Sequence, residues 1–262
     1  MDYIFENILS SIHILLLTSV PLFLLGWVFR YIGGILQNTM FDSLGFFTFV
    51  IIYPFIAIHE LCHLIMALLF TKRIVSFRLF KFRDLESSMG YVQTAQSNTR
   101  FKLRRLYENI GDFFVGLAPL FLGTIIILFL MFLFANTTFT NMSDFINSLG
   151  YLEVLKKVPS LFLDNFLIMF IISLVSVSSL FFLSQEDMKV ATSGFPYLVG
   201  TVFFVNLIFG NFSVVQSFFE AMIQLQKYIN LVSLIVILYA ILIWILLLII
   251  SVIKDVIDEK NN

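Results

Sequence analysis

The chain has 262 residues, of which 60% are hydrophobic and only 13% are charged. A soluble domain carries about twice that charged fraction, so the composition excludes an ordinary soluble protein and predicts a membrane protein. The net charge of −1, without a basic tract interleaved with aromatic residues, gives no indication of nucleic acid binding. The single cysteine, Cys62, excludes an intrachain disulfide and a cysteine-rich zinc site.

Six stretches of the chain reach the length of about 20 apolar residues that spans a bilayer. We place them at residues 12–32, 44–70, 113–134, 161–183, 196–212 and 228–253. The N-terminus is acidic and lacks the basic region of a cleavable signal peptide, so the first stretch should be retained. No internal repeat or linker is visible. The sequence therefore predicts an all-α polytopic protein forming a single integral membrane domain over residues 1–262.

The connection between the second and third stretches carries nine of the sixteen Lys and Arg residues. They are Lys72, Arg73, Arg78, Lys81, Arg83, Arg100, Lys102, Arg104 and Arg105. Because short basic loops stay on the cytoplasmic side, this loop is predicted to be cytoplasmic. Six spans then place both termini in the cytoplasm, and the predicted location is the cell membrane.

This loop also contains a candidate β-hairpin. Residues 74–83 are rich in β-branched and aromatic side chains with partial alternation, and residues 89–94 could pair with them after a turn. The open edge of such a hairpin could hold an extended substrate peptide by strand addition at Gly90, Tyr91 and Val92. An amphipathic stretch lying on the membrane surface is the alternative interpretation.

His59, Glu60 and His63 form a His-Glu-x-x-His motif inside the second apolar stretch. On a helix the two histidines lie one turn apart on the same face, so both imidazoles can reach one zinc ion. Glu60 lies beside them, where it can act as the general base for a water activated by zinc. Ionisable residues are costly in a membrane helix, which favours a metal site over hydrogen bonding between neighbouring helices.

A catalytic zinc ion usually takes three protein ligands and leaves a position for water, so a third ligand must come from elsewhere. His13 lies near the end of the first stretch, where an interfacial role suits it better. Carboxylates are better candidates, and Asp187, after the fourth stretch, is one of them. Asp112 is another, although its position at the start of the third stretch also suits a helix N-cap. Spacing alone does not exclude Glu186.

Three motifs follow one another along the chain. The first is the His-Glu-x-x-His motif at residues 58–63, and the second is a small-residue and proline motif at 115–123. The third is Ser-Gln-Glu-Asp at 184–187, followed by Ala191 and Gly194. In their order and spacing these motifs resemble those of the site-2 protease family of intramembrane zinc metalloproteases. The family's usual third motif is an Asp-Gly pair, whereas here a methionine follows the aspartate.

The resemblance implies a particular architecture. It places a three-helix metalloprotease core at about residues 44–196, with flanking helices at 12–32 and 228–253, as in the six-helix branch of the family. It also implies a hairpin after the motif helix, in agreement with the composition of the basic loop. No soluble segment is long enough for a PDZ-like domain.

The resemblance further implies one Zn²⁺ ion, bound by His59, His63 and Asp187, with Glu60 as the catalytic base. The implied activity is hydrolysis of peptide bonds in membrane-embedded proteins or peptides, so the expected partners are such a substrate and the lipid bilayer. Two other functions remain open. One is a non-catalytic membrane receptor or immunity protein that keeps the metal site. The other is a proton-coupled transporter that uses the same ionisable groups as a proton relay.

Overall fold

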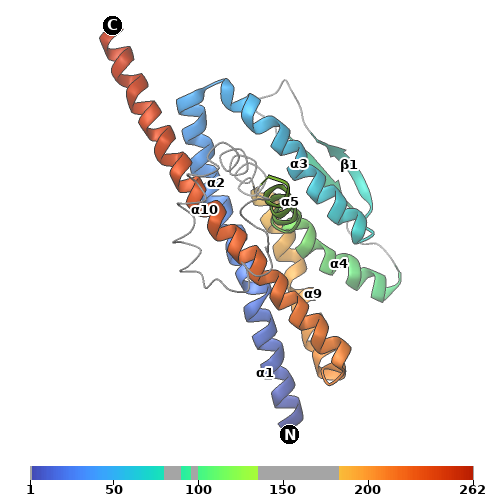
Figure 1. The fold of residues 1–262 in the computed structure, drawn as a ribbon. Coiled ribbons are helices and arrows are strands. Elements are labelled where there is room, and N and C mark those ends of the chain that lie inside the picture. The colour runs from blue at the N-terminus through green and yellow to red at the C-terminus, as the bar shows by residue number, and fades with distance from the viewer. Residues whose placement is uncertain (1, 80–89, 96–99, 135–182, 262) are drawn as a thin grey trace.

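The computed structural model describes residues 2–79, 90–95, 100–134 and 183–261 of the chain (Figure 1). This part is mostly helical and contains one small two-stranded sheet, so the predicted helical fold class with a short hairpin is confirmed at this level. The predicted span at 161–183 lies outside the described residues, except for its last residue.

The long apolar helices agree with a membrane protein. Helix α2 (Ser19–Leu44) follows α1 (Asp2–Leu17) after one residue. Helices α9 (Gln185–Phe209) and α10 (Ser213–Asn261) are the last two elements of the described chain. Among the described residues, three stretches are long and apolar enough to cross a bilayer: Ile4–Leu44, Gln185–Phe209 and Ser213–Lys254. They include or overlap the predicted spans at the two ends of the chain. The total of six spans and the cytoplasmic termini remain predictions.

The third predicted span differs from the observed helices. Helix α4 (Lys102–Gly116) begins well before residue 113, and α5 (Ala118–Phe134) continues from it after a bend of 59°. The pair makes a fourth crossing only if it is counted as one broken span. The bend falls at Leu117, two residues before Pro119. Proline lacks a backbone N–H and clashes with the preceding turn, which accounts for the break.

Helix α3 (Phe47–Leu69) carries the His-Glu-x-x-His motif and leads into the hairpin. Strands β1 (Ile74–Arg78) and β2 (Tyr91–Thr94) pair antiparallel, with Arg78 opposite Tyr91, which confirms the predicted hairpin. The two strands lie alongside α3 (Figure 1). Their position on the cytoplasmic side of a membrane remains a prediction.

Helices α4 and α9 pack with their backbones in contact. A Cβ atom added to Gly116 would meet the carbonyl of Asp187 and the backbone of Ala191. A Cβ atom added to Gly194 would likewise meet the backbone of α4 at Phe113. Small residues allow this close approach between helices in a membrane protein. The contact sets the first turn of α9 against the last turn of α4, close to the motif helix.

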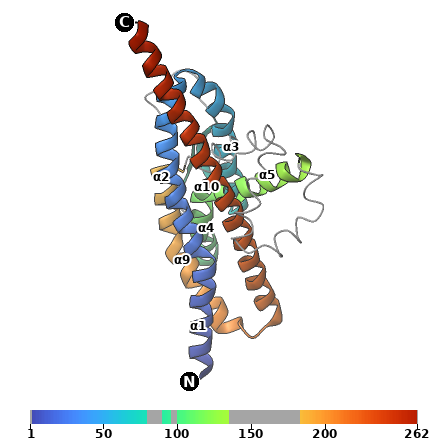
Figure 2. The same cartoon turned by 60° about the vertical axis from the view of Figure 1, so that its left-hand side comes forward.

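The interior of the bundle is filled by apolar side chains from several helices. Phe29 of α2, Leu117 between α4 and α5, Met188 of α9 and Ile229 of α10 all belong to one buried cluster. Helix α10 packs along α2, as the turned view shows (Figure 2). Apolar packing thus holds most of the core together, and a few buried polar contacts cross between helices, such as that from Asn206 of α9 to the Asn7 carbonyl of α1.

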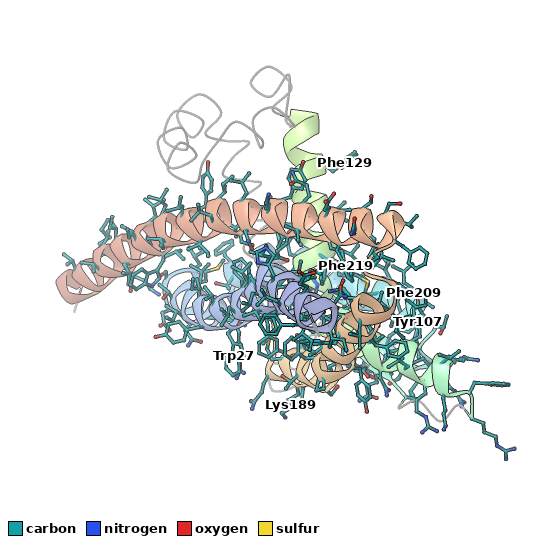
Figure 3. All side chains as sticks on the ribbon, turned by 90° about the horizontal axis from the view of Figure 1, so that it is seen from below. Trp27, Tyr107, Phe129, Lys189, Phe209 and Phe219 are labelled. Atoms are coloured by element: carbon teal, nitrogen blue, oxygen red, sulfur yellow. The ribbon has the colours of Figure 1, made fainter. Side chains whose placement is uncertain are left out.

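Large apolar side chains also cover the outside of the bundle. Trp27, Phe129 and Phe209 are exposed, and they lie on three different helices (Figure 3). Monomeric soluble proteins rarely expose apolar patches of such extent, whereas lipid is a suitable environment for them. The surface therefore supports the membrane location indicated by composition.

Candidate metal centre

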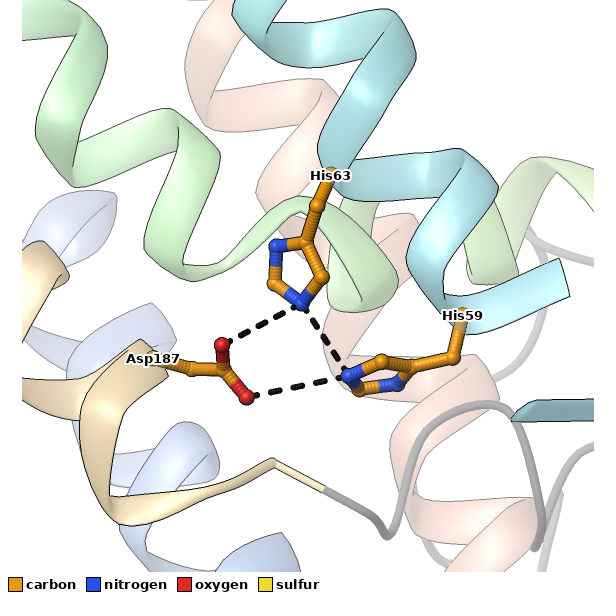
Figure 4. A group of neighbouring side chains, drawn as sticks. All are labelled: His59, His63 and Asp187. Atoms are coloured by element: carbon orange, nitrogen blue, oxygen red, sulfur yellow. Dashed lines mark hydrogen bonds and ion pairs between the residues drawn. The ribbon is translucent and has the colours of Figure 1, made fainter. Parts of the chain in front are cut away.

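The two histidines of the motif lie on the same face of α3, as the sequence predicts. His59 and His63 are both buried, with 4% of the surface of each residue exposed. Their Nε2 atoms lie 3.0 Å apart, and the rings meet edge to face (Figure 4). Because the residues are four apart, one turn of helix brings both imidazoles to one point.

Asp187 reaches the histidine pair from the first turn of α9. Its Oδ1 atom lies 3.3 Å from Nε2 of His63, and its Oδ2 atom lies 3.7 Å from Nε2 of His59 (Figure 4). The three residues each offer a ligand atom within 4.8 Å of the others, so the group could hold a metal ion. Asp187 thus occupies the position that the sequence analysis reserved for a third ligand.

A capping box fixes the carboxylate of Asp187. The backbone N–H of Ser184 donates to Oδ2 of Asp187 at 2.6 Å, and the N–H of Asp187 donates to Oγ of Ser184 at 3.1 Å. Helix α9 therefore starts at Gln185 and not at residue 196, where the apolar stretch was predicted to begin. The Ser-x-x-Asp pattern is a helix start signal that the hydropathy reading missed.

The other acidic candidates lie elsewhere. Asp112 forms an ion pair with the buried Lys72, which follows α3, and it is not part of the His-His-Asp group. It is not a helix N-cap either, because α4 begins ten residues earlier, at Lys102. Glu186 is exposed and pairs with Lys189 at 2.6 Å. The geometry therefore favours Asp187 as the third ligand.

His13, the remaining histidine, is exposed on α1 and does not belong to the group.

The spacing of the three ligand atoms suits a small tetrahedral ion. Ligand atoms about 2.0–2.1 Å from a tetrahedral zinc ion lie about 3.3 Å from one another. In the structure the two Nε2 atoms lie 3.0 Å apart, and the two carboxylate oxygens of Asp187 lie 3.3 Å from Nε2 of His63 (Oδ1) and 3.7 Å from Nε2 of His59 (Oδ2), all close to that value. Two imidazoles and one carboxylate also match the donor set of catalytic zinc sites with an open fourth position. The residues present thus fit zinc.

The hydrogen bonding of His63 gives a second argument for a cation. Its Nδ1 atom lies 2.7 Å from the carbonyl oxygen of Val115, which can only accept, so Nδ1 carries the proton. In the neutral ring, Nε2 then presents a lone pair towards Oδ1 of Asp187, another acceptor. Two acceptors at this distance repel each other unless a positive charge lies between them. A metal ion or a second proton on His63 supplies that charge.

Glu60 lies beside the group and against the hairpin. Glu60 is buried, with 9% of the residue exposed, in the same turn of α3 as His59 and His63. A Cβ atom added to Gly90 would lie 2.6 Å from Cγ of Glu60 and 2.9 Å from the carbonyl of Leu79. The residue that precedes β2 is thus in direct contact with the candidate general base.

Of the other two predicted substrate-binding residues, Tyr91 opens β2 with Arg78 against its ring, and Val92 pairs with Phe77.

No protein family model matches the chain, and neither a curated protein nor a solved structure does. The resemblance to site-2 proteases rests on the three motifs. The geometry of His59, His63 and Asp187 is therefore the basis for assigning a function.

Proposed function

We propose that this chain is an intramembrane zinc metalloprotease that hydrolyses peptide bonds of membrane-embedded proteins or peptides. The observation that carries the proposal is the convergence of His59, His63 and Asp187 on one point, with the carboxylate of Glu60 in the same turn of α3. A metal site that only stabilised the fold would have no need of a buried, unliganded carboxylate beside it.

His59, His63 and Asp187 would hold the zinc ion. Bound zinc would supply Lewis acidity, which activates water as a nucleophile and polarises the scissile carbonyl. Glu60 would accept the proton of the attacking water and pass it to the leaving amine. Helix α3 holds His59, Glu60 and His63 in place, and the capping box holds Asp187, so the four side chains stay close together.

The hairpin supports a peptide substrate. A peptide bond inside a helix is held in the helix's own hydrogen bonds, so cleavage requires an extended backbone. Strand addition to the hairpin would extend it. Gly90, which precedes β2, contacts Glu60, so a strand added there would pass close to the proposed catalytic groups. Tyr91 and Val92 would then hold the neighbouring substrate residues.

The proposal includes the cell membrane as the location, with several crossings and both termini in the cytoplasm. The exposed apolar side chains and the long helices support a bilayer environment. The excess of Lys and Arg between α3 and α4 supports the orientation.

The decisive experiment compares wild type with Glu60→Gln in proteoliposomes that contain a panel of single-span membrane peptides. We expect Glu60→Gln to keep one bound zinc ion and to lose cleavage by a factor of about 10²–10⁴, the range for a lost general base. Glu186→Gln is the matched control, since that carboxylate is exposed and pairs with Lys189. Equal cleavage by wild type and Glu60→Gln would contradict the proposal. Zinc binding without any cleavage would favour the non-catalytic receptor.

A further inference from the structure

The bend between α4 and α5 leaves one backbone carbonyl without its usual helical partner. In a continuous α-helix the carbonyl of Val115 would accept the N–H of residue 119. Residue 119 is Pro119, which has no N–H. The N–H of Leu117 is directed to the carbonyls of both Phe113 and Val115, so it is shared between them. The break thus makes an acceptor available at the end of α4.

That acceptor is the one that His63 contacts. Nδ1 of His63 lies 2.7 Å from the Val115 oxygen, across the interface between α3 and α4. His63, Val115, Leu117 and Pro119 are all buried, so this bond forms in an apolar environment. A buried carbonyl and a buried imidazole N–H each need a partner, and here each satisfies the other.

We propose that Pro119 is a positioning residue for the metal ligand His63. Because it withholds an amide proton, the Val115 carbonyl is free to accept the Nδ1 proton of His63, and this fixes the tautomer whose Nε2 lone pair points to His59 and Asp187. This inference rests on the proposed function only in that the metal is bound at His63. Partners of this kind orient a ligating histidine and raise its basicity.

A purely structural role of Pro119 is the competing explanation. Proline bends helices wherever it occurs inside them, and the bend alone could explain its presence. The two roles differ in what replacement with alanine does to the histidine. If Pro119 only bends the helix, the tautomer of His63 need not change. If it provides the acceptor, alanine supplies an N–H at residue 119 that competes for the Val115 carbonyl, and His63 loses its fixed tautomer.

The experiment is ¹⁵N NMR of histidine side chains in the purified full-length chain, in micelles and free of metal. The chain has three histidines, and His13→Gln and His59→Gln assign the signals. In wild type we expect His63 to carry its proton on Nδ1. In Pro119→Ala we expect a mixture of tautomers for His63 and an unchanged His59. Pro196→Ala is the matched control, because Pro196 also lies inside a helix, α9.

Metal affinity is the second readout, measured with Zn²⁺ in competition with a chromophoric chelator. Pro119→Ala should bind Zn²⁺ about 10–100-fold more weakly than wild type, the usual cost of losing such a partner. Pro196→Ala should bind as wild type does.

A neutral His63 ring in wild type whose single proton lies on Nε2 would overturn the proposal without the need for any variant. So would a folded Pro119→Ala chain with the wild-type tautomer and affinity, and Pro119→Gly serves as a second variant if the alanine chain does not fold. The tautomer is read without metal or cleavage, so these results are separate from a failure of the protease assay.

Discussion

Replacing Gly116 with alanine should separate the metal ligands while the chain stays folded. The added Cβ atom would lie 2.5 Å from the backbone nitrogen of Ala191 and 2.7 Å from its Cβ atom. Non-bonded carbon atoms rest about 3.5–4.0 Å apart, so α4 and α9 must move apart by about 1 Å. Gly116 belongs to α4 and Ala191 to α9, and neither atom of Ala191 moves when a side chain rotates, so only a shift of the helices can relieve the contact.

Asp187 moves with α9, whereas His63 stays with α3 and its bond to α4. A displacement of about 1 Å would increase the distance of 3.3 Å between Oδ1 of Asp187 and Nε2 of His63 to about 4 Å. Metal sites tolerate deviations of about 0.2 Å in their bond lengths. We therefore expect Gly116→Ala to weaken zinc binding at least tenfold, with a loss of stability of about 1–3 kcal/mol from overpacking.

The assay is zinc affinity by chelator competition together with a thermal melt followed by circular dichroism. Gly200→Ala is the matched control, since Gly200 lies in α9, the helix that Gly116 contacts, and an added Cβ atom there meets nothing within 4 Å. Both variants gain the helix propensity of alanine, about 1 kcal/mol, so their difference isolates the packing effect. Wild-type zinc affinity in a folded Gly116→Ala chain would refute the reasoning.

Three further substitutions test the site. Asp187→Asn should lose bound zinc, measured by elemental analysis, because a neutral amide replaces the anionic ligand; retention of zinc would exclude Asp187. Asp112→Asn should keep zinc but lower the melting temperature, because it leaves Lys72 buried without its partner at a cost of about 3 kcal/mol; loss of zinc would instead revive Asp112 as a ligand. Gly90→Ala should keep zinc and lower cleavage about 10²-fold, because the new methyl group displaces Glu60; an unchanged cleavage rate would contradict that contact.

The parts of the site that depend on spacing within one helix could be predicted from the sequence. The four-residue separation of His59 and His63 determines that they share a face, whatever the rest of the chain does. The hairpin was also predictable, because β-branched and aromatic residues gather in two short runs. Asp187 was chosen by resemblance, and its place beside the histidines agrees with that choice.

The helix boundaries could not be read from hydropathy. An apolar window measures compatibility with lipid, and the first turns of α9 are polar, so the predicted span began at Pro196 instead of Gln185. The same criterion began the third span at residue 113, although the polar, basic residues from Lys102 onward belong to the same helix. The break at Leu117 and the bond from His63 to Val115 depend on how two helices pack against each other, and a local sequence pattern does not predict that packing.

The site obtains its polar groups from places where helices begin and end. Asp187 lies in the first turn of α9, where the helix dipole favours a carboxylate and the capping box orients it. Val115 lies in the last turn of α4, where the break makes its carbonyl available. A chain with only 13% charged residues can therefore assemble an acidic ligand and a histidine partner inside an apolar bundle. Gly116 and Gly194 allow α4 and α9 to approach closely and so bring these two helix ends together. Replacing either glycine with a larger residue should therefore weaken metal binding, as replacing a ligand does.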